Sequence, residues 1–159
     1  MQYDEYKFKF YLNASHSIFI NGVLGEEHPH TWEITIYTIK FHTGFVIFND
    51  VERYVEKYMK KYQDSYINRI EPFITLNPTL ENMCKFFKDN MKALLAEKGW
   101  ILLSIEISET PTRSYVIDLS REAELKYGLN FEKEDILEEA AINKVKELKK
   151  LLEKNVKMV

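Results

Sequence analysis

Three histidines in the first part of the chain, His16, His28 and His30, have the chemistry and the spacing of metal ligands. His28 and His30 are two residues apart at the start of a predicted β-strand, where side chains at i and i+2 point to the same side. His16 lies on or just after the preceding predicted strand, so a hairpin would bring its ring to the same place. Three nitrogen ligands leave a fourth position open, which is typical of a catalytic zinc ion.

The spacing alone leaves a second interpretation open, because two histidines at a strand end are often ordinary exposed residues. Cys84 is the only cysteine. Any metal must therefore be bound by histidines and carboxylates, and no intrachain disulfide can form. His42, the fourth histidine, is expected to be an ordinary strand-end residue.

The strands that must position the three histidines are predicted from a two-residue hydrophobic repeat. Residues 5–13 alternate over part of their length, and residues 31–39 alternate again and are rich in β-branched and aromatic types. The pair Asn21-Gly22 between them is a typical turn sequence. The simplest interpretation is one long antiparallel hairpin, with Trp32 and Phe45 in the core.

Two helices are predicted after these strands. The first runs from about residue 50 to 62, with Asn49 as its N-cap. The second has Asn77 as its N-cap and Pro78 in its first position, and Gly99 ends it. Its apolar residues repeat at helical spacing: Leu80, Met83, Cys84, Phe87, Met91, Leu94 and Leu95.

The rest of the chain predicts two more strands, residues 100–107 and 114–119, and a third helix from about residue 131 to 156. Strands, then helices, then strands indicate an α+β fold and not a parallel sheet. We expect one domain over residues 1–120, with residues 121–159 as its C-terminal helical extension. The apolar stripe of that extension would cover its own sheet or a neighbouring subunit, or would dock a partner.

Composition narrows the classes of function. The chain has 159 residues, a net charge of −3 and lysines interleaved with acids, so nucleic acid is not expected as a partner. Its sequence contains neither an apolar run long enough for a membrane span nor an N-terminal signal pattern. We therefore expect a cytoplasmic protein.

Several motifs together resemble the 6-pyruvoyl-tetrahydropterin synthase and 6-carboxytetrahydropterin synthase family. The segment ending at His16 is similar to the family's Ala-Ala-His, and residues 28–32 are similar to its His-Gly-His, with Pro29 in place of glycine. Three further segments carry the resemblance, which covers residues 5 to about 119: Thr43-Gly44-Phe45-Val46, Asn68-Arg69-Ile70-Glu71-Pro72-Phe73 and Pro78-Thr79-Leu80-Glu81-Asn82.

The resemblance implies the tunnelling fold, in which subunits join their sheets into a barrel, usually as a dimer of trimers with active sites at subunit interfaces. It implies zinc on the three histidines and a pterin anchored by Glu109. A carboxylate suits that role because it can accept two parallel hydrogen bonds from the amino edge of a pterin. The alternative for Glu109 is a solvated loop acid.

Two catalytic elements of the family are not matched. The cysteine a few residues before His-Gly-His is replaced, and Cys84 lies on the apolar stripe of the second helix. The family's Asp-His pair aligns with Gln63-Asp64. A subgroup instead uses a glutamate two residues before His-Gly-His, and Glu26 stands at that spacing, although it can also be a simple turn acid. Glu26 is the candidate base and Asp64 a second proton carrier.

The expected function is a zinc-dependent lyase that forms a tetrahydropterin from 7,8-dihydroneopterin triphosphate or a related pterin, in queuosine or folate biosynthesis. One alternative is a variant that releases 6-hydroxymethyl-dihydropterin, with Glu26 in place of the catalytic cysteine. The other is a non-catalytic or repurposed oligomer that binds metal and pterin. The lyase is the leading hypothesis, and the residues leave open whether its product is the pyruvoyl, carboxy or hydroxymethyl form.

Overall fold

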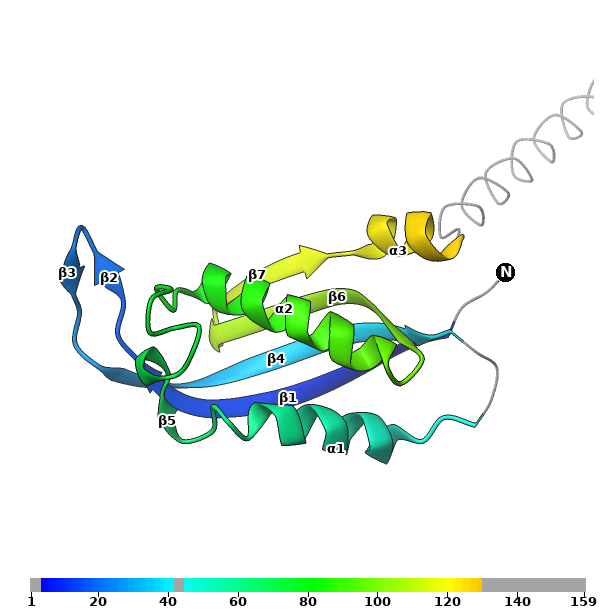
Figure 1. Ribbon diagram of the computed structural model, residues 1–159, viewed down its shortest axis with the longest axis horizontal. Helices are drawn as coiled ribbons and strands as arrows, with labels where there is room; N and C mark the ends of the chain where they lie inside the picture. The colour runs from blue at the N-terminus through cyan, green and yellow to red at the C-terminus, as the bar shows by residue number, and fades with distance from the viewer. Residues whose placement is uncertain (1–3, 42–44, 130–159) are drawn as a thin grey trace, which may run out of the picture. The chain divides into compact units, whose positions relative to one another are not determined.

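The computed structural model describes residues 4–41 and 45–129. It has the α+β architecture predicted from the sequence, with one five-stranded sheet and helices packed on it (Figure 1). The longer elements are β1 (Glu5–His16), β4 (His28–Lys40), α1 (Phe48–Met59), α2 (Leu80–Ala96), β6 (Trp100–Thr110), β7 (Arg113–Asp118) and α3 (Ser120–Tyr127). The short elements are β2 (Phe19–Ile20), β3 (Val23–Leu24), β5 (Ser65–Tyr66) and the 3-10 turn η1 (Ile67–Arg69).

The sheet has the strand order β5-β1-β4-β6-β7. β1 and β4 pair antiparallel along their whole length, from Glu5 opposite Ile39 to His16 opposite His28. β6 pairs antiparallel with both β4 and β7, whereas β5 adds a short parallel pairing at the end of β1. The predicted long hairpin is therefore confirmed, and both of its strands extend to the histidines.

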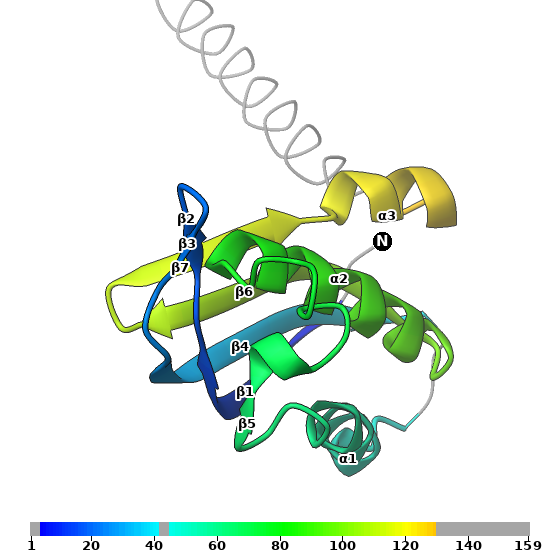
Figure 2. The ribbon, with the colours of Figure 1, turned by 60° about the vertical axis from the view of Figure 1, so that its left-hand side comes forward.

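The core lies between one face of this sheet and the helices α1 and α2, which both cover that face (Figures 1 and 2). Every second residue of β1 and β4 points into the core, as a strand's two-residue period requires. Each large apolar side chain buried there stabilises the fold by roughly 1.5–3 kcal/mol. The sheet contributes Phe8, Phe10, Leu12, Trp32, Ile34, Ile36, Ile105 and Ile107 to this core.

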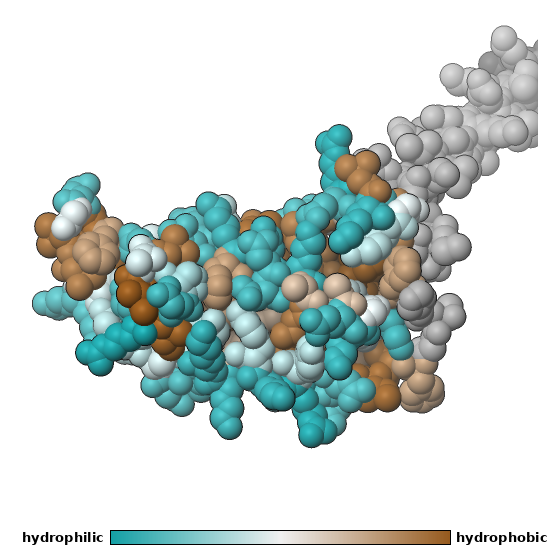
Figure 3. Space-filling model, in the orientation of Figure 1, coloured by the Kyte–Doolittle hydropathy of each residue, from teal (hydrophilic) through white to brown (hydrophobic). Residues whose placement is uncertain are grey.

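The turn pair Asn21-Gly22 lies where expected but closes a different hairpin. Asn21 has φ 51° and Gly22 has φ 79°. Two successive positive φ angles match the right-handed twist of a tight hairpin. They join β2 to β3, a small separate ribbon between β1 and β4 (Figure 1). Its apolar side chains are exposed and form the brown patch at the left of Figure 3: Phe19, Ile20, Val23 and Leu24.

Both helix starts were predicted wrongly. α1 begins at Phe48 and ends at Met59, and its N-cap is Ile47, without a side-chain cap bond. α2 begins at Leu80, capped by Thr79, whose side chain accepts a hydrogen bond from the backbone N–H of Asn82.

Asn77 does not cap α2 because its amide is used elsewhere. Its side chain accepts a hydrogen bond from the Phe19 N–H and donates one to the Phe19 carbonyl, which fastens the β2–β3 ribbon to the segment before α2. The end of α2 agrees with the prediction. Gly99 has φ +75°, a conformation that glycine adopts without strain.

Burial confirms one core prediction and corrects another. Trp32 is fully buried, whereas Phe45 is 93% exposed and lies in the segment between β4 and α1. α3 was not predicted, since its eight residues carry little apolar periodicity. The predicted third helix, residues 131–156, and His42 lie outside the described residues.

Residues 4–123, apart from the segment 42–44, belong to one compact unit that ends within α3. Of the chain that follows, the structure describes residues 124–129, which include the last residues of α3. Within the described ranges, none of the helices combines the length and the apolar character that crossing a membrane requires.

Candidate metal centre

The antiparallel pairing of β1 with β4 brings the three histidines together. His16 is the last residue of β1 and lies opposite His28, the first residue of β4, and Ala14 lies opposite His30. All three histidines belong to the alternation that faces the core. Their ring centroids are 4.5 Å (His16 to His28), 5.1 Å (His16 to His30) and 4.9 Å (His28 to His30) apart.

Backbone carbonyls orient two of the rings. His16 Nδ1 lies 2.8 Å from the carbonyl oxygen of Pro78, just before α2, and His28 Nδ1 lies 3.0 Å from the carbonyl oxygen of Glu26. A carbonyl can only accept, so each Nδ1 carries the hydrogen and donates it. This tautomer leaves Nε2 with a lone pair, which is the usual arrangement of a metal-binding histidine.

Two of the ring nitrogens make no hydrogen bond. His16 Nε2 and His30 Nε2 are both buried without one, although both lie within ion-pair distance of the Glu109 carboxylate. An unpaired buried polar atom destabilises a protein by roughly 1–3 kcal/mol. A divalent cation could bind to the lone pairs of both nitrogens, so these residues fit a metal ion.

Glu109 completes the cluster from β6. It lies on the same side of that strand as Ile105 and Ile107, because it is an even number of residues from both. It is only 9% exposed, so it is not a solvated loop acid. Its Oε1 atom lies 3.0 Å from His30 Nε2 and 3.9 Å from His16 Nε2. One ligand atom from each of the four residues falls within 4.8 Å of the others: His16, His28, His30 and Glu109.

Burial keeps two of the histidines in the form that binds metal. The pKa of His16 and that of His30 are lowered, chiefly because burial disfavours the charged ring, and the neighbouring His28 lowers both further. The carboxylate of Glu109 opposes this shift in both rings. Because both pKa values fall below 6.5, both rings are mainly neutral at pH 7.

Two residues of the site were not identified from the sequence as parts of it. Trp32 packs against His16 and His30, with ring centroids 5.0 and 5.2 Å away, and its indole N–H is buried without a partner. Arg113, at the start of β7, lies 3.5 Å from Glu109 Oε1 and is largely exposed. Glu109 and Arg113 carry opposite charges on the two sides of the predicted turn between β6 and β7. This pattern in the sequence could have indicated the pair.

Glu26 is close to the cluster only through its backbone. Its carbonyl orients His28, while the residue as a whole is exposed. The next carboxylate, Glu27, accepts a 2.5 Å hydrogen bond from Ser15 Oγ. The carboxylate of Glu26 is not among the four ligand atoms.

Asp64 is not brought to the four ligand atoms either. It is exposed, has φ 55°, and precedes β5 at the edge of the sheet. It borders a shallow hollow of about 550 Å³. The hollow is lined by Asn13, Ala14, Ser15, Pro29, His30, Thr31, Asp64 and Ser65.

Cys84 cannot replace the missing thiolate. It is fully buried on α2, as predicted, and its Sγ lies 3.6 Å from the carbonyl oxygen of Tyr115. Burial raises the pKa of its thiol to about 12. A thiol with that pKa is protonated at neutral pH and is a poor base or nucleophile.

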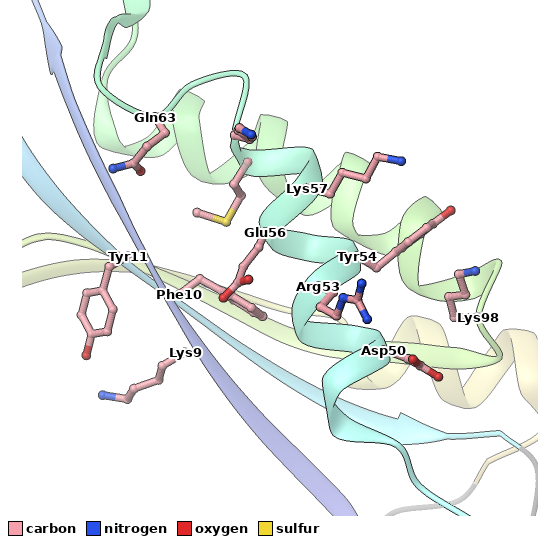
Figure 4. A pocket seen from close by; sticks show the side chains of 12 residues that line it. Lys9, Phe10, Tyr11, Asp50, Arg53, Tyr54, Glu56, Lys57, Gln63 and Lys98 are labelled. Carbon is pink, nitrogen blue, oxygen red and sulfur yellow. The ribbon is translucent and has the colours of Figure 1, made fainter.

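A larger groove lies between β1 and α1 and contains none of the predicted site residues. Its volume is about 1040 Å³. Figure 4 shows it lined by polar and charged side chains from both elements, including Lys9, Tyr11, Arg53, Glu56 and Lys57. The histidine cluster is therefore separate from this groove.

Comparison with known proteins places the fold. The family described as 6-pyruvoyl tetrahydropterin synthase matches residues 5–120. No curated protein matches the sequence. Among solved structures, the chain is similar to the 6-pyruvoyl tetrahydropterin synthase of Caenorhabditis elegans, with 13% identity, a TM-score of 0.63, and coverage of 74% of this chain and 96% of the other.

Two Plasmodium proteins show the same likeness. The 6-pyruvoyl tetrahydropterin synthase of Plasmodium falciparum has 14% identity and a TM-score of 0.54, with 72% of this chain and 96% of the other covered. A catalytic-residue mutant of the Plasmodium vivax protein, in which alanine replaces a glutamate, has 12% identity and a TM-score of 0.58, with 74% and 98% covered.

Proposed function

This chain belongs to the 6-pyruvoyl tetrahydropterin synthase family, and on that premise we propose that it is a metal-dependent lyase acting on 7,8-dihydroneopterin triphosphate or a related pterin. The observation that carries the proposal is the convergence of three histidines and Glu109, with two buried imidazole nitrogens that make no hydrogen bond. A purely structural role would leave both nitrogens without a hydrogen bond.

Zinc is the proposed metal. Imidazole nitrogens with at most one carboxylate suit zinc better than magnesium or calcium, which prefer oxygen ligands. His16, His28 and His30 would hold it. When bound, the ion supplies a Lewis acid that polarises an oxygen of the substrate side chain and makes the neighbouring proton easier to remove.

The remaining chemistry is assigned to carboxylates of this chain. Glu109 accepts hydrogen bonds from the amino edge of the pterin and so orients the ring. Glu26 is the proposed base that removes a proton from the side chain of the substrate, and Asp64 is the proposed second proton carrier. Positioned acid–base groups of this kind typically contribute about 10²–10⁴-fold to a rate.

The proposal includes a neighbouring subunit. Asp64 and the four ligand atoms are not gathered at one site in a single chain. A second copy that brings its own Asp64 to the histidine cluster would complete the site. The assembly implied by the family resemblance, a dimer of trimers with interfacial active sites, has this property.

A second candidate is release of 6-hydroxymethyl-dihydropterin, with Glu26 as the base. One observation favours it. The Glu26 carbonyl accepts a hydrogen bond from His28 Nδ1, so the backbone of Glu26 lies next to a proposed metal ligand. The Plasmodium vivax protein, whose catalytic-residue mutants include a glutamate replaced by alanine, offers a precedent for a carboxylate in this family.

A third candidate is a repurposed protein that binds metal and pterin without turnover. It is favoured by the protonated, buried thiol of Cys84 and by the exposure of Glu26 and Asp64. Both features leave the proton-transfer step without a buried, activated group in one chain.

Product analysis distinguishes the three candidates. Zinc-loaded protein is incubated with 7,8-dihydroneopterin triphosphate, and the pterins are separated and identified by mass, with His28→Ala as the control. A new 6-pyruvoyl or 6-carboxy product supports the lyase, and 6-hydroxymethyl-dihydropterin supports the second candidate. Binding of the substrate with unchanged pterin supports the third, and neither binding nor turnover contradicts all of them.

A further inference from the structure

Glu109 occupies a position that does not suit a pterin anchor when a metal is bound. Its Oε1 atom is 3.0 Å from His30 Nε2, so it lies directly beside a proposed metal ligand. A pterin is two fused rings wide. The carboxylate that holds its amino edge and the metal that binds the side chain on the other ring must be separated by that width.

The same position does suit a metal ligand. In a tetrahedral zinc site with bonds near 2.1 Å, neighbouring ligand atoms are about 3.4 Å apart. Glu109 Oε1 is 3.0 Å from His30 Nε2 and 3.9 Å from His16 Nε2, which brackets that spacing. The three histidines alone would leave this corner of the tetrahedron open.

We propose that Glu109 is the fourth ligand of the metal in the pterin-free protein and that it leaves the metal when a pterin binds. The inference rests on the proposed function, since it requires a metal on the histidines and a pterin as the ligand. Binding of the pterin thus opens the metal position that the substrate side chain needs.

The backbone around Glu109 suits a side chain with two positions. β6 and β7 pair Ser108 with Ser114 and Thr110 with Arg113, so Glu109 has no partner in the register and forms a β-bulge. Bulges re-aim side chains and are common next to active sites. Two neighbours compete for the same oxygen. His30 Nε2 lies 3.0 Å from Oε1, and the positively charged guanidinium of Arg113 lies 3.5 Å from it.

Arg113 also shows where the carboxylate can go. Its side chain is 63% exposed, whereas the side chain of Glu109 is 8% exposed, so a movement of Oε1 toward Arg113 is a movement toward solvent. The guanidinium keeps a partner for Glu109 after it leaves the metal. The carboxylate then remains charged and able to accept hydrogen bonds from the amino edge of a pterin.

The experiment uses the full-length protein loaded with Co²⁺, whose visible absorption bands depend on the number and type of its ligands. Wild type is compared with Glu109→Gln and with Glu106→Gln, a matched control on the same strand whose position faces the other side of the sheet. Each spectrum is recorded before and after addition of neopterin, whose side chain carries no phosphate to eliminate. Binding of neopterin is measured separately by calorimetry, and folding of each variant by circular dichroism.

We expect the wild-type and Glu106→Gln spectra to coincide and to change on addition of neopterin. Glu109→Gln should differ from wild type before any pterin is added, should bind zinc at least about tenfold more weakly, and should change little with neopterin. The wild-type titration needs no variant, so it remains informative if Glu109→Gln does not fold.

Two results would overturn the inference, and they separate it from the proposed function. Identical cobalt spectra for wild type and folded Glu109→Gln, with neopterin still bound by wild type, would show that Glu109 is no ligand while the pterin site stands. A wild-type spectrum that depends on Glu109, in a protein that does not bind neopterin, would refute the exchange together with the pterin-binding function.

Discussion

At the end of the sheet where β1 finishes and β4 begins, the two faces differ in the functional groups that they bring together. The core face gathers His16, His28, His30 and Glu109 within 4.8 Å of one another. The other face has Asn13, Ser15 and Thr31, with Asp64 beside them at a shallow hollow. One chain therefore gathers four candidate metal ligands but leaves a candidate proton carrier outside the cluster.

Burial explains why the two faces behave differently. On the core face, α2 and its preceding loop exclude water, fix His16 through the Pro78 carbonyl and lower the pKa of the rings by desolvation. On the other face the polar side chains pair with each other, as Thr31 donates a 2.7 Å hydrogen bond to Asn13. The fold of one chain thus gathers the candidate metal ligands, whereas the proposed proton carriers remain exposed until a further surface encloses them.

The largest effect is expected from removing a ligand on the core face. Loss of a residue that only hydrogen-bonds to a metal ligand lowers metal affinity by roughly 10–100-fold. His16→Ala should lower zinc affinity by more than this, because it removes a proposed ligand itself. Zinc affinity is measured by competition with a chelator. Asn13→Ala, on the other face, is the control and should keep its zinc; equal loss in both variants would contradict the distinction between the faces.

Removing a carboxylate outside the cluster should reduce turnover and leave metal binding intact. Asp64→Asn and Glu26→Gln are each expected to lower turnover by about 10²–10⁴-fold at unchanged zinc content. Co-expression of Asp64→Asn with His28→Ala should restore part of the activity if neighbouring chains complete each other's sites. Full activity in both carboxylate variants would exclude them as proton carriers.

The metal-free protein should lose stability as the pH falls below about 6.5. The folded-state pKa values of His16 and His30 are lowered by burial, so the unfolded chain binds more protons below 6.5 than the folded chain does. Well above pH 6.5 both rings are neutral in the folded and in the unfolded chain, so their contribution to the free energy of unfolding no longer changes with pH. Urea unfolding between pH 5 and 8 measures this, and His16→Asn should flatten the curve; a wild-type stability that rises on acidification would contradict it.

The smallest effect is expected at Cys84. Its thiol is buried and protonated, so Cys84→Ala should retain turnover and cost about 1 kcal/mol of unfolding free energy through lost packing. The native thiol should react with a disulfide reagent only after unfolding. Loss of turnover in a stable Cys84→Ala protein would show that the thiol takes part in the reaction.

The sequence predicted that the three histidines converge, because their placement depends on local rules. The two-residue period fixes the common side of His28 and His30, and the register of a hairpin fixes His16 opposite them. The strands and α2 follow from strong hydrophobic repeats. The α+β fold could be predicted for the same reason.

What could not be predicted depends on contacts between distant segments. Asn77 is as good a helix cap as Thr79, and only its pairing with Phe19 decides against it. The approach of Glu109 to His30 requires the bulge between β6 and β7, which no sequence pattern revealed. Apolar character alone suggested a core position for Phe45, which the fold leaves exposed.

The central claim is that His16, His28 and His30 hold a metal ion within one chain. Its most direct test is the metal content of wild-type protein purified without a tag, determined by mass spectrometry of the elements. We predict close to one zinc per chain, and its loss in His28→Ala. A correctly folded wild-type protein that retains no metal, even after incubation with zinc and removal of the excess, would contradict the account.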